Sequence, residues 1–355
     1  HSYVRYDPLG PVLAVMPWNF PLWQVMRFAG PGLMAGNVGV LKHAANVPQS
    51  ALYIEEVFRR AGYPEGAFTT LLIPASGVAA VVEDERIAAV TLTGSEGAGA
   101  AVAATAGRVL KKCVLELGGS DPFVVTRTAD VERSAAVAVT ARVQNNGQSC
   151  IAAKRFIVDA DVYDEWVDRF VAGMAALRVG DPMDPSNDVG PLVTEAQRTE
   201  IASQVDDARD KGATVACGGS AIPGPGWYYE PTVLLDVTTE MRVLKEEVFG
   251  PVATVERYTD LDEAIRIANR TQYGLGSSIW TRDPAERERL VAGIQAGQVF
   301  VNTMVASSPE LPFGGIKRSG YGRELSDMGI KEFCNAKSVR EDANSPVPTA
   351  GSAAE

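Results

Sequence analysis

A cysteine in a polar, glycine-containing loop is the residue of this chain best suited to covalent chemistry. Cys150 ends the stretch 145–150, Asn-Asn-Gly-Gln-Ser-Cys, and the apolar residues 151–153 follow at once. A thiol exposed on a loop beside backbone amides is the usual setting of a cysteine nucleophile. Because an intracellular cysteine is more often a small buried hydrophobe, this interpretation requires a base and an oxyanion donor elsewhere in the chain.

Two other residues could supply those groups. Glu116 ends an apolar, strand-like run and precedes two glycines. Desolvation there would raise its pKa toward that of a useful general base, although a glutamate at a strand end can equally well face solvent. Asn19 stands between two prolines after another apolar run. Its amide could point at a developing oxyanion, or it could cap the helix that follows.

Composition limits the classes of function. The chain has 355 residues, 46% of them hydrophobic, and a net charge of −11 without a basic block, so binding to nucleic acid or to an anionic membrane is not expected. It shows neither an apolar run long enough to span a bilayer nor a signal peptide. Four cysteines without paired spacing and only two histidines make a metal site unexpected. These features predict a cytoplasmic protein with reduced thiols.

The predicted secondary structure explains how residues so far apart in sequence could meet. Short apolar runs typical of buried strands alternate with helix-like segments from residue 12 to residue 92, and a second α/β region begins near residue 155. This order predicts parallel strands with right-handed crossovers, a doubly wound α/β sheet. Ligands bind beyond the carboxyl ends of such strands. The residues at those ends are Trp18, Asn19, Lys42, Thr93, Gly94 and Ser95.

The glycine-rich stretch 94–99 follows one of these strands and opens a predicted helix. Exposed backbone amides at a helix N-terminus can bind phosphate. The stretch lacks the complete G-x-G-x-x-G fingerprint of dinucleotide sites. Ser95 could therefore serve a cofactor or act only as the N-cap of the helix.

Six stretches together resemble motifs of the aldehyde dehydrogenase superfamily, in the order found in that family. They are PWNFP at 17–21, LTGS at 92–95, ELGG at 116–119, GQSC at 147–150, EVFGP at 247–251 and PFGG at 312–315. The resemblance implies that family's fold: a doubly wound parallel-sheet NAD(P)-binding domain at 9–118, an α/β catalytic domain at 119–328 and oligomerisation strands at 1–8 and 329–341. A homodimer or homotetramer is expected.

The two ends of the chain carry further expectations. Members of the superfamily have a long segment ahead of the position of Tyr3, so we expect an N-terminally truncated chain. The tail 342–355 is rich in alanine, serine, proline and glycine. Such a composition predicts disorder.

The resemblance also implies the oxidation of an aldehyde to a carboxylic acid. Cys150, as a thiolate, would attack the aldehyde carbon while the Asn19 amide and the Cys150 backbone N–H hold the oxyanion. Hydride transfer from the thiohemiacetal to a nicotinamide would leave a thioester. Glu116 would activate the water that releases the acid, and it could also help to deprotonate the thiol.

The same resemblance assigns a cofactor site. Glu247 would hold the nicotinamide ribose, Phe249 would lie beside the ring, and Gly118 would leave room for it. Members that prefer NAD often carry a glutamate three residues after Lys42, where this chain has Ala45. Without that carboxylate, Lys42 could pair with a 2′-phosphate, so NADP is expected to be preferred over NAD. The other predicted cofactor residues are Trp18, Thr93, Gly94, Ser95 and Leu117.

Within the family, the chain is most similar to bacterial succinate-semialdehyde dehydrogenases, which implies succinic semialdehyde as the substrate. In those enzymes the positions of Arg27 and Ser307 bind the far carboxylate, a task that suits an arginine. Arg27 could alternatively form a structural salt bridge. Gln144 stands where some of these enzymes have a second arginine, so carboxylate binding could be weaker or could use another residue.

Two other functions remain compatible with these motifs. Acylating semialdehyde dehydrogenases release a coenzyme A thioester and commonly lack a glutamate at the position of Glu116, so its presence favours hydrolysis. A non-catalytic scaffold of the same fold would not need Cys150, Glu116 and Asn19, although a missing N-terminal segment would fit it. Formation of NADPH from succinic semialdehyde would separate these functions.

Overall fold

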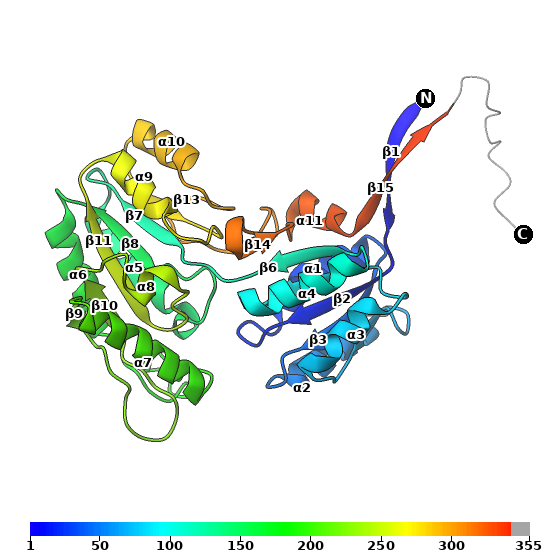
Figure 1. Cartoon of the computed structure of the whole chain (residues 1–355), viewed down its shortest axis with the longest axis horizontal. Coiled ribbons are helices and arrows are strands. Elements are labelled where there is room, and N and C mark those ends of the chain that lie inside the picture. The colour runs from blue at the N-terminus through cyan, green and yellow to red at the C-terminus, as the bar shows by residue number, and fades with distance from the viewer. Residues whose placement is uncertain (342–355) are drawn as a thin grey trace, which may run out of the picture.

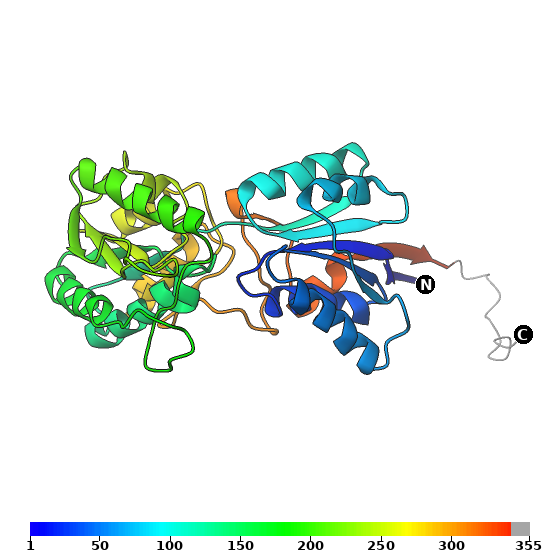
Figure 2. The same ribbon diagram turned by 90° about the horizontal axis from the view of Figure 1, so that it is seen from below.

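The computed structural model describes residues 1–341, which form two lobes and a projecting arm (Figure 1). Each lobe is built around one sheet, and the lobes lie side by side in both views (Figure 2). The arm pairs β1 (Ser2–Pro8) with β15 (Cys334–Arg340) in antiparallel register. The tail 342–355, for which we predict disorder, lies outside the described residues.

The first lobe contains a six-stranded sheet with helices on both faces. Its strands are β2 (Pro11–Met16), β3 (Val38–His43), β4 (Phe68–Thr70), β5 (Ala89–Thr93), β6 (Lys112–Glu116) and β14 (Gly320–Tyr321), and its helices are α1 (Trp23–Met34), α2 (Pro48–Arg60), η1 (Ala75–Gly77), α3 (Val78–Glu83), α4 (Glu96–Arg108) and α11 (Ser326–Glu332). The strand order is β14-β6-β5-β2-β3-β4, parallel from β6 to β4. Because successive side chains of a strand alternate between faces, Val12 packs with α1 and α2 while Leu13 packs with α3 and α4.

The second lobe contains a seven-stranded sheet in the order β13-β12-β7-β8-β11-β10-β9, in which β9 alone pairs antiparallel. Its strands are β7 (Pro122–Val125), β8 (Arg155–Asp159), β9 (Thr214–Cys217), β10 (Thr232–Leu235), β11 (Val252–Tyr258), β12 (Ser278–Trp280) and β13 (Phe300–Val301). Its helices are α5 (Val131–Val143), η2 (Gln144–Gly147), α6 (Tyr163–Ala175), α7 (Glu195–Asp210), α8 (Arg242–Lys245), α9 (Leu261–Asn269), α10 (Pro284–Gly293) and η3 (Lys317–Ser319).

Aromatic side chains fill much of the core of the second lobe. Phe123, Phe156 and Trp280 of the sheet are buried against Trp166 and Phe170 of α6. Together the two parallel-rich sheets confirm the predicted α/β fold class. None of the helices in residues 1–341 is both long enough and apolar enough to cross a membrane.

One segment leaves the second lobe and returns to the first. Strand β14 pairs antiparallel with β6, with Gly320 opposite Glu116, and α11 packs on α1. Our sequence-based boundaries assigned β14 to the catalytic domain at 119–328, whereas the structure makes it an edge strand of the first sheet. The pairing depends on glycine, since a Cβ on Gly320 would collide with the Leu115 carbonyl.

The parallel register of the first sheet brings the predicted site segments to one edge. Val15 lies opposite Leu92, and Thr93 lies opposite Glu116. The chain segments that continue from β2, β5 and β6 therefore leave the sheet together. Figure 1 shows β2 and β6 directed toward the second lobe, which contains Cys150.

Candidate active site

A cavity of about 270 Å³ lies between the two lobes at this edge of the sheet. Most of the predicted site residues line it: Trp18, Asn19, Thr93, Gly94, Ser95, Glu116, Leu117, Gly118, Cys150, Glu247 and Phe249. Three residues that we did not predict also line it, namely Pro17, Gln24 and Gln197. Five predicted residues lie outside its lining, namely Arg27, Lys42, Ala45, Gln144 and Ser307.

The loop that carries Cys150 has an unusual backbone, and its sequence explains why. Asn145, Asn146 and Gly147 have φ values of 50°, 58° and 74°, three consecutive residues in the left-handed region. Asparagine and glycine tolerate this conformation best. A Cβ on Gly147 would also collide with the Gly250 carbonyl of the EVFGP turn. The stretch Asn-Asn-Gly is therefore a local requirement of this loop.

Side chains tie the Cys150 loop to its surroundings. Asn145 Nδ2 donates to the Asn19 carbonyl at 2.7 Å, and Asn146 Oδ1 accepts from the Gly190 N–H at 2.8 Å. Gln148 Oε1 accepts from the Val193 N–H at 2.9 Å. These contacts hold the loop against both lobes.

The side-chain amide of Asn19 is fixed in orientation beside this loop. Its Nδ2 donates to the Gln148 carbonyl at 3.0 Å, and its Oδ1 accepts from Gln24 Nε2 at 3.1 Å. An amide nitrogen carries two hydrogens, so one N–H of Asn19 stays available at the cavity wall. Gln24 is buried within α1, and no motif in the sequence predicted its contact with Asn19.

Cys150 is only partly exposed, whereas the sequence suggested a thiol on an exposed loop. Its Ile151 neighbour and the buried Phe313 pack around it. This burial raises the pKa of the Cys150 thiol to about 12, against the opposing effect of Arg27 and Lys154. The thiol is therefore protonated at neutral pH, and it must lose a proton before it can attack a carbonyl.

The pH dependence of Cys150 alkylation tests this conclusion. In the cofactor-free protein, the rate of reaction with iodoacetamide is expected to rise about tenfold per pH unit from pH 7 to pH 10, because the thiolate fraction rises by that factor below the pKa. Mass spectrometry of the Cys150 peptide measures the rate, with free cysteine as a control whose rate levels off near pH 9. A plateau for Cys150 below pH 9 would show that its thiolate is already stabilised.

Glu116 occupies an apolar, buried position at the cavity wall. Its side chain is 2% exposed, and neither carboxylate oxygen has a hydrogen-bond partner among the described residues. Burial raises the pKa of Glu116 well above its usual value, and the nearby Glu324 adds to the rise while Arg27 opposes it. A buried, unpaired carboxyl group with a raised pKa has the properties of a general base that works near neutral pH.

Arg27 already has a carboxylate partner within the protein. Its Nε lies 2.7 Å from Glu324 Oε2, both side chains are buried, and its guanidinium lies 4.1 Å from the centre of the Phe313 ring. Removing one partner of such a buried pair costs about 3–5 kcal/mol. This arrangement matches the structural alternative that we considered for Arg27. A substrate-binding role for Arg27 stays a prediction.

The three predicted substrate residues share one property. Arg27 Nη2, Gln144 Nε2 and Ser307 Oγ are buried atoms without a hydrogen-bond partner within residues 1–341. Buried donors of this kind are costly unless something satisfies them. An anionic ligand group would do so.

The predicted cofactor residues form the other wall of the cavity. The rings of Trp18 and Phe249 meet edge-to-face, with centroids 6.0 Å apart. Ser95 caps α4 by accepting from the Ala98 N–H at 3.4 Å, so the N-terminus of this thirteen-residue helix borders the cavity. Lys42 lies at the end of β3, and Ala45 follows it in an exposed turn. No carboxylate side chain stands at the Ala45 position to repel a 2′-phosphate.

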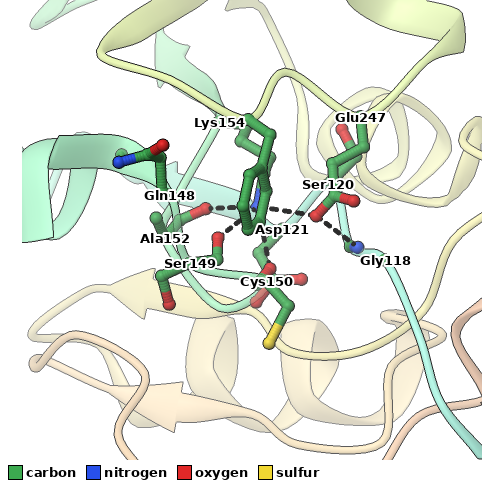
Figure 3. Close-up of polar contacts among 12 residues, drawn as sticks. Gly118, Ser120, Asp121, Gln148, Ser149, Cys150, Ala152, Lys154 and Glu247 are labelled. Carbon is green, nitrogen blue, oxygen red and sulfur yellow. Dashed lines mark hydrogen bonds and ion pairs between the residues drawn. The ribbon is translucent and has the colours of Figure 1, made fainter. Parts of the chain in front are cut away.

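Glu247 is held at the cavity by the backbone of the first lobe. Its Oε1 accepts from the Gly119 N–H at 3.0 Å, and a Cβ on Gly118 would collide with its Oε2. Gly118 thus makes room for the Glu247 carboxylate in this structure. Figure 3 shows Glu247 beside Gly118 and above the Cys150 loop.

Comparison with known proteins gives consistent matches over nearly the whole described chain. The family model described as "Aldehyde dehydrogenase family" matches residues 1–339. The NADP(+)-dependent succinate-semialdehyde dehydrogenase of Mycobacterium avium is 64% identical over 338 residues, which cover 95% of this chain and 72% of that enzyme. Its Mycobacterium tuberculosis counterpart is 62% identical over 338 residues, covering 95% of this chain and 74% of that enzyme.

Solved structures agree with these matches. The succinic semialdehyde dehydrogenase of Streptococcus pyogenes, solved with NADP+, superposes with a TM-score of 0.93 at 40% identity and covers 96% of this chain and 75% of that one. An NAD-dependent aldehyde dehydrogenase of Sinorhizobium meliloti gives a TM-score of 0.95 at 32% identity, covering 98% of this chain and 69% of that one.

Proposed function

The chain belongs to the aldehyde dehydrogenase family, and we propose that it oxidises succinic semialdehyde to succinate with NADP+ as the hydride acceptor. The observation that carries this proposal is the single cavity that Cys150, Glu116 and Asn19 line together. These residues come from three different parts of the chain. A buried thiol, a buried carboxyl group and a fixed amide in one cavity suit covalent oxidation of a carbonyl.

In the first half of the reaction, Cys150 forms a bond to the aldehyde carbon. Its proton leaves to water or to Glu116, which lies at the same cavity wall. As the carbonyl oxygen gains negative charge, the free N–H of the Asn19 amide and the backbone N–H of Cys150 stabilise it. Gln24 supports this step because it holds the Asn19 amide in place.

NADP+, when bound, would supply the hydride acceptor for oxidation of the thiohemiacetal to a thioester. We propose that Phe249 and Glu247 hold its nicotinamide half, that Trp18 contacts the adenine-ribose and pyrophosphate side, and that the N-terminus of α4 at Ser95 holds a phosphate. Lys42, without a carboxylate at Ala45, would pair with the 2′-phosphate.

In the second half, water releases succinate from Cys150. Glu116, once deprotonated, takes a proton from this water, which then attacks the thioester carbon. The raised pKa of Glu116 makes it a stronger base than an exposed glutamate. Cys150 leaves as the thiolate and is ready for another turnover.

We also propose that the far carboxylate of the substrate is bound by Arg27, Gln144 and Ser307. Each carries a buried polar atom without a partner in the described chain. Because Arg27 is paired with Glu324, binding of the substrate would add a second carboxylate to this arginine.

The arm supports a further proposal, assembly as a homodimer or homotetramer. Strand β1 exposes the large side chains of Tyr3, Val4 and Tyr6. A projecting two-stranded ribbon is marginally stable alone, and exposed strands tend to pair. Sedimentation velocity tests this proposal, and a monomer at micromolar concentration would contradict it.

An aldehyde panel with both cofactors tests the proposed function. We expect kcat/KM with NADP+ for succinic semialdehyde to exceed that for butanal, an uncharged aldehyde of the same length, by about 10²-fold, since a hydrogen bond to a charged group is worth about 1.5–3 kcal/mol. Added coenzyme A should not change the product. No turnover of any aldehyde by the folded protein would overturn the proposal, and a thioester product would favour the acylating alternative.

Cofactor preference gives a separate prediction at Ala45. Ala45→Glu is expected to lower kcat/KM for NADP+ by about tenfold or more, because a carboxylate near the 2′-phosphate costs at least about 1.4 kcal/mol in repulsion and lost pairing with Lys42. The value for NAD+ should change little. Ala45→Gln, which adds the same bulk without charge, is the control. Equal losses in both variants would show that bulk rather than charge determines the effect.

A further inference from the structure

A lysine buried directly behind the Cys150 loop has no role in the reaction as described so far. Lys154 is 1% exposed. Its Nζ donates to the carbonyl oxygens of Ser149, Cys150 and Ala152 at 3.0, 2.8 and 3.1 Å. An ammonium group carries three hydrogens, so these three acceptors match it completely.

The charge of Lys154 is balanced from the cofactor side of the cavity. Its Nζ lies 3.6 Å from Glu247 Oε1, the same oxygen that accepts from the Gly119 N–H. Burial lowers the pKa of Lys154, and Glu247 acts against this shift. Figure 3 shows Lys154 between the loop carbonyls and Glu247, with the Cys150 sulfur on the far side of the loop.

The contact with Ser149 has a geometric consequence for Cys150. The Ser149 C=O and the Cys150 N–H belong to one planar trans peptide unit, in which the two bonds point in opposite directions. Lys154 and the Ala152 N–H, which donates to the same Ser149 oxygen at 3.2 Å, hold this carbonyl and therefore direct the Cys150 N–H to the opposite side. That N–H makes no hydrogen bond to any residue of 1–341. It can therefore donate to an oxyanion.

We propose that Lys154 is a positioning residue for the reaction: by holding the Ser149 carbonyl, it aims the Cys150 N–H at the oxyanion. This inference rests on the proposed function, in which that N–H stabilises the tetrahedral intermediate. Since Glu247 balances the same ammonium, Lys154 also links the nucleophile loop to the predicted ribose-binding residue. Lys154 touches neither the substrate nor the reacting atoms.

A second buried cation provides a matched control. Arg142 is fully buried, and its Nη2 donates to the Gly147 carbonyl of the same loop at 2.9 Å. That carbonyl shares its peptide unit with the Gln148 N–H, which is bonded to the Asn145 carbonyl. Arg142 therefore steadies the loop without setting the direction of the Cys150 N–H.

The test compares two reactions of Cys150 that need neither cofactor nor aldehyde. With p-nitrophenyl acetate, the thiolate bonds to the acyl carbon, an oxyanion forms and then collapses, and p-nitrophenolate leaves. With iodoacetamide, the thiolate displaces iodide and no oxyanion forms. The ratio of the acylation rate to the alkylation rate cancels any change in thiolate fraction, so it reports the oxyanion donors alone.

Lys154→Met is expected to lower this ratio by about tenfold or more, since complete loss of one oxyanion donor costs about 10²- to 10³-fold. Arg142→Met should leave the ratio within about twofold of the parent protein. The acylation rate is corrected by subtracting the rate of the Cys150→Ala variant. The alkylation rate is measured on the Cys150 peptide. An unchanged ratio in Lys154→Met, or equal falls in both variants, would overturn the proposal.

A second variant covers the case in which Lys154→Met does not fold, because removing one partner of a buried pair leaves an uncompensated charge. Lys154→Met combined with Glu247→Gln removes both charges and is compared with Glu247→Gln alone, with the same fall in ratio expected. Since the assay uses neither NADP+ nor succinic semialdehyde, a protein that fails the aldehyde panel can still pass this test, and the two failures are distinguishable.

Discussion

Cys150→Ala is expected to abolish NADPH formation from succinic semialdehyde, with kcat lowered on the order of 10⁶-fold, the size typical of losing a covalent nucleophile. The reason is structural as well as chemical. Cys150 is the only cysteine that lines the cavity within residues 1–341, while Cys113, Cys217 and Cys334 lie elsewhere in the fold. No other thiol can take its place.

The control for this substitution is Cys113→Ala. Cys113 is also partly buried, and burial raises its pKa to about 11, so it resembles Cys150 in exposure and in the direction of its pKa shift. It lies on β6, outside the lining of the cavity. We expect full turnover in Cys113→Ala, measured by NADPH absorbance. Turnover by a folded Cys150→Ala protein above about 10⁻³ of the parent would contradict the covalent mechanism.

Glu116→Gln is expected to separate the two halves of the reaction. Loss of a general base slows a step by about 10²- to 10⁴-fold, and release of the acid needs that base to activate water. A stopped-flow trace should therefore show one equivalent of NADPH formed per active site, followed by a much slower steady rate. Glutamine has nearly the same shape as glutamic acid, so the packing around this buried side chain is preserved.

Two further observations sharpen the experiment on Glu116. Hydroxylamine attacks a thioester without a general base, so it should restore turnover in Glu116→Gln and yield a hydroxamate. The variant should also be at least as stable as the parent protein at neutral pH, because it removes a buried carboxyl group that faces Glu324. A variant with no initial burst would show instead that Glu116 is essential for deprotonating Cys150.

The short motifs could be interpreted from the sequence because their requirements are local. The Cys150 loop needs residues that accept a left-handed backbone, and Asn145, Asn146 and Gly147 provide them. The strand–helix order predicted parallel strands whose carboxyl ends meet at one edge, and the register of Thr93 with Glu116 has this form. The comparisons confirm the predicted family and fold class, and NADP is the cofactor named for the similar enzymes.

Other features were outside the reach of the sequence. The partner of a buried charge depends on which segments pack together, and no local pattern encodes it. Arg27 and Glu324 stand on α1 and shortly before α11, and only the packing of these helices places them 2.7 Å apart. The Gln24 contact with Asn19 depends in the same way on how α1 follows its loop.

The sequence by itself therefore determined which chemical groups are available for the reaction. The nucleophile, the carboxyl group and the amide each lie in a short motif whose backbone conformation depends on local residues. The tertiary structure decided how those groups are tuned. Packing buries Cys150 and Glu116 and raises their pKa values. Packing also brings Glu247 within 3.6 Å of the buried Lys154, since desolvation and charge balance arise only when distant segments enclose the same small volume.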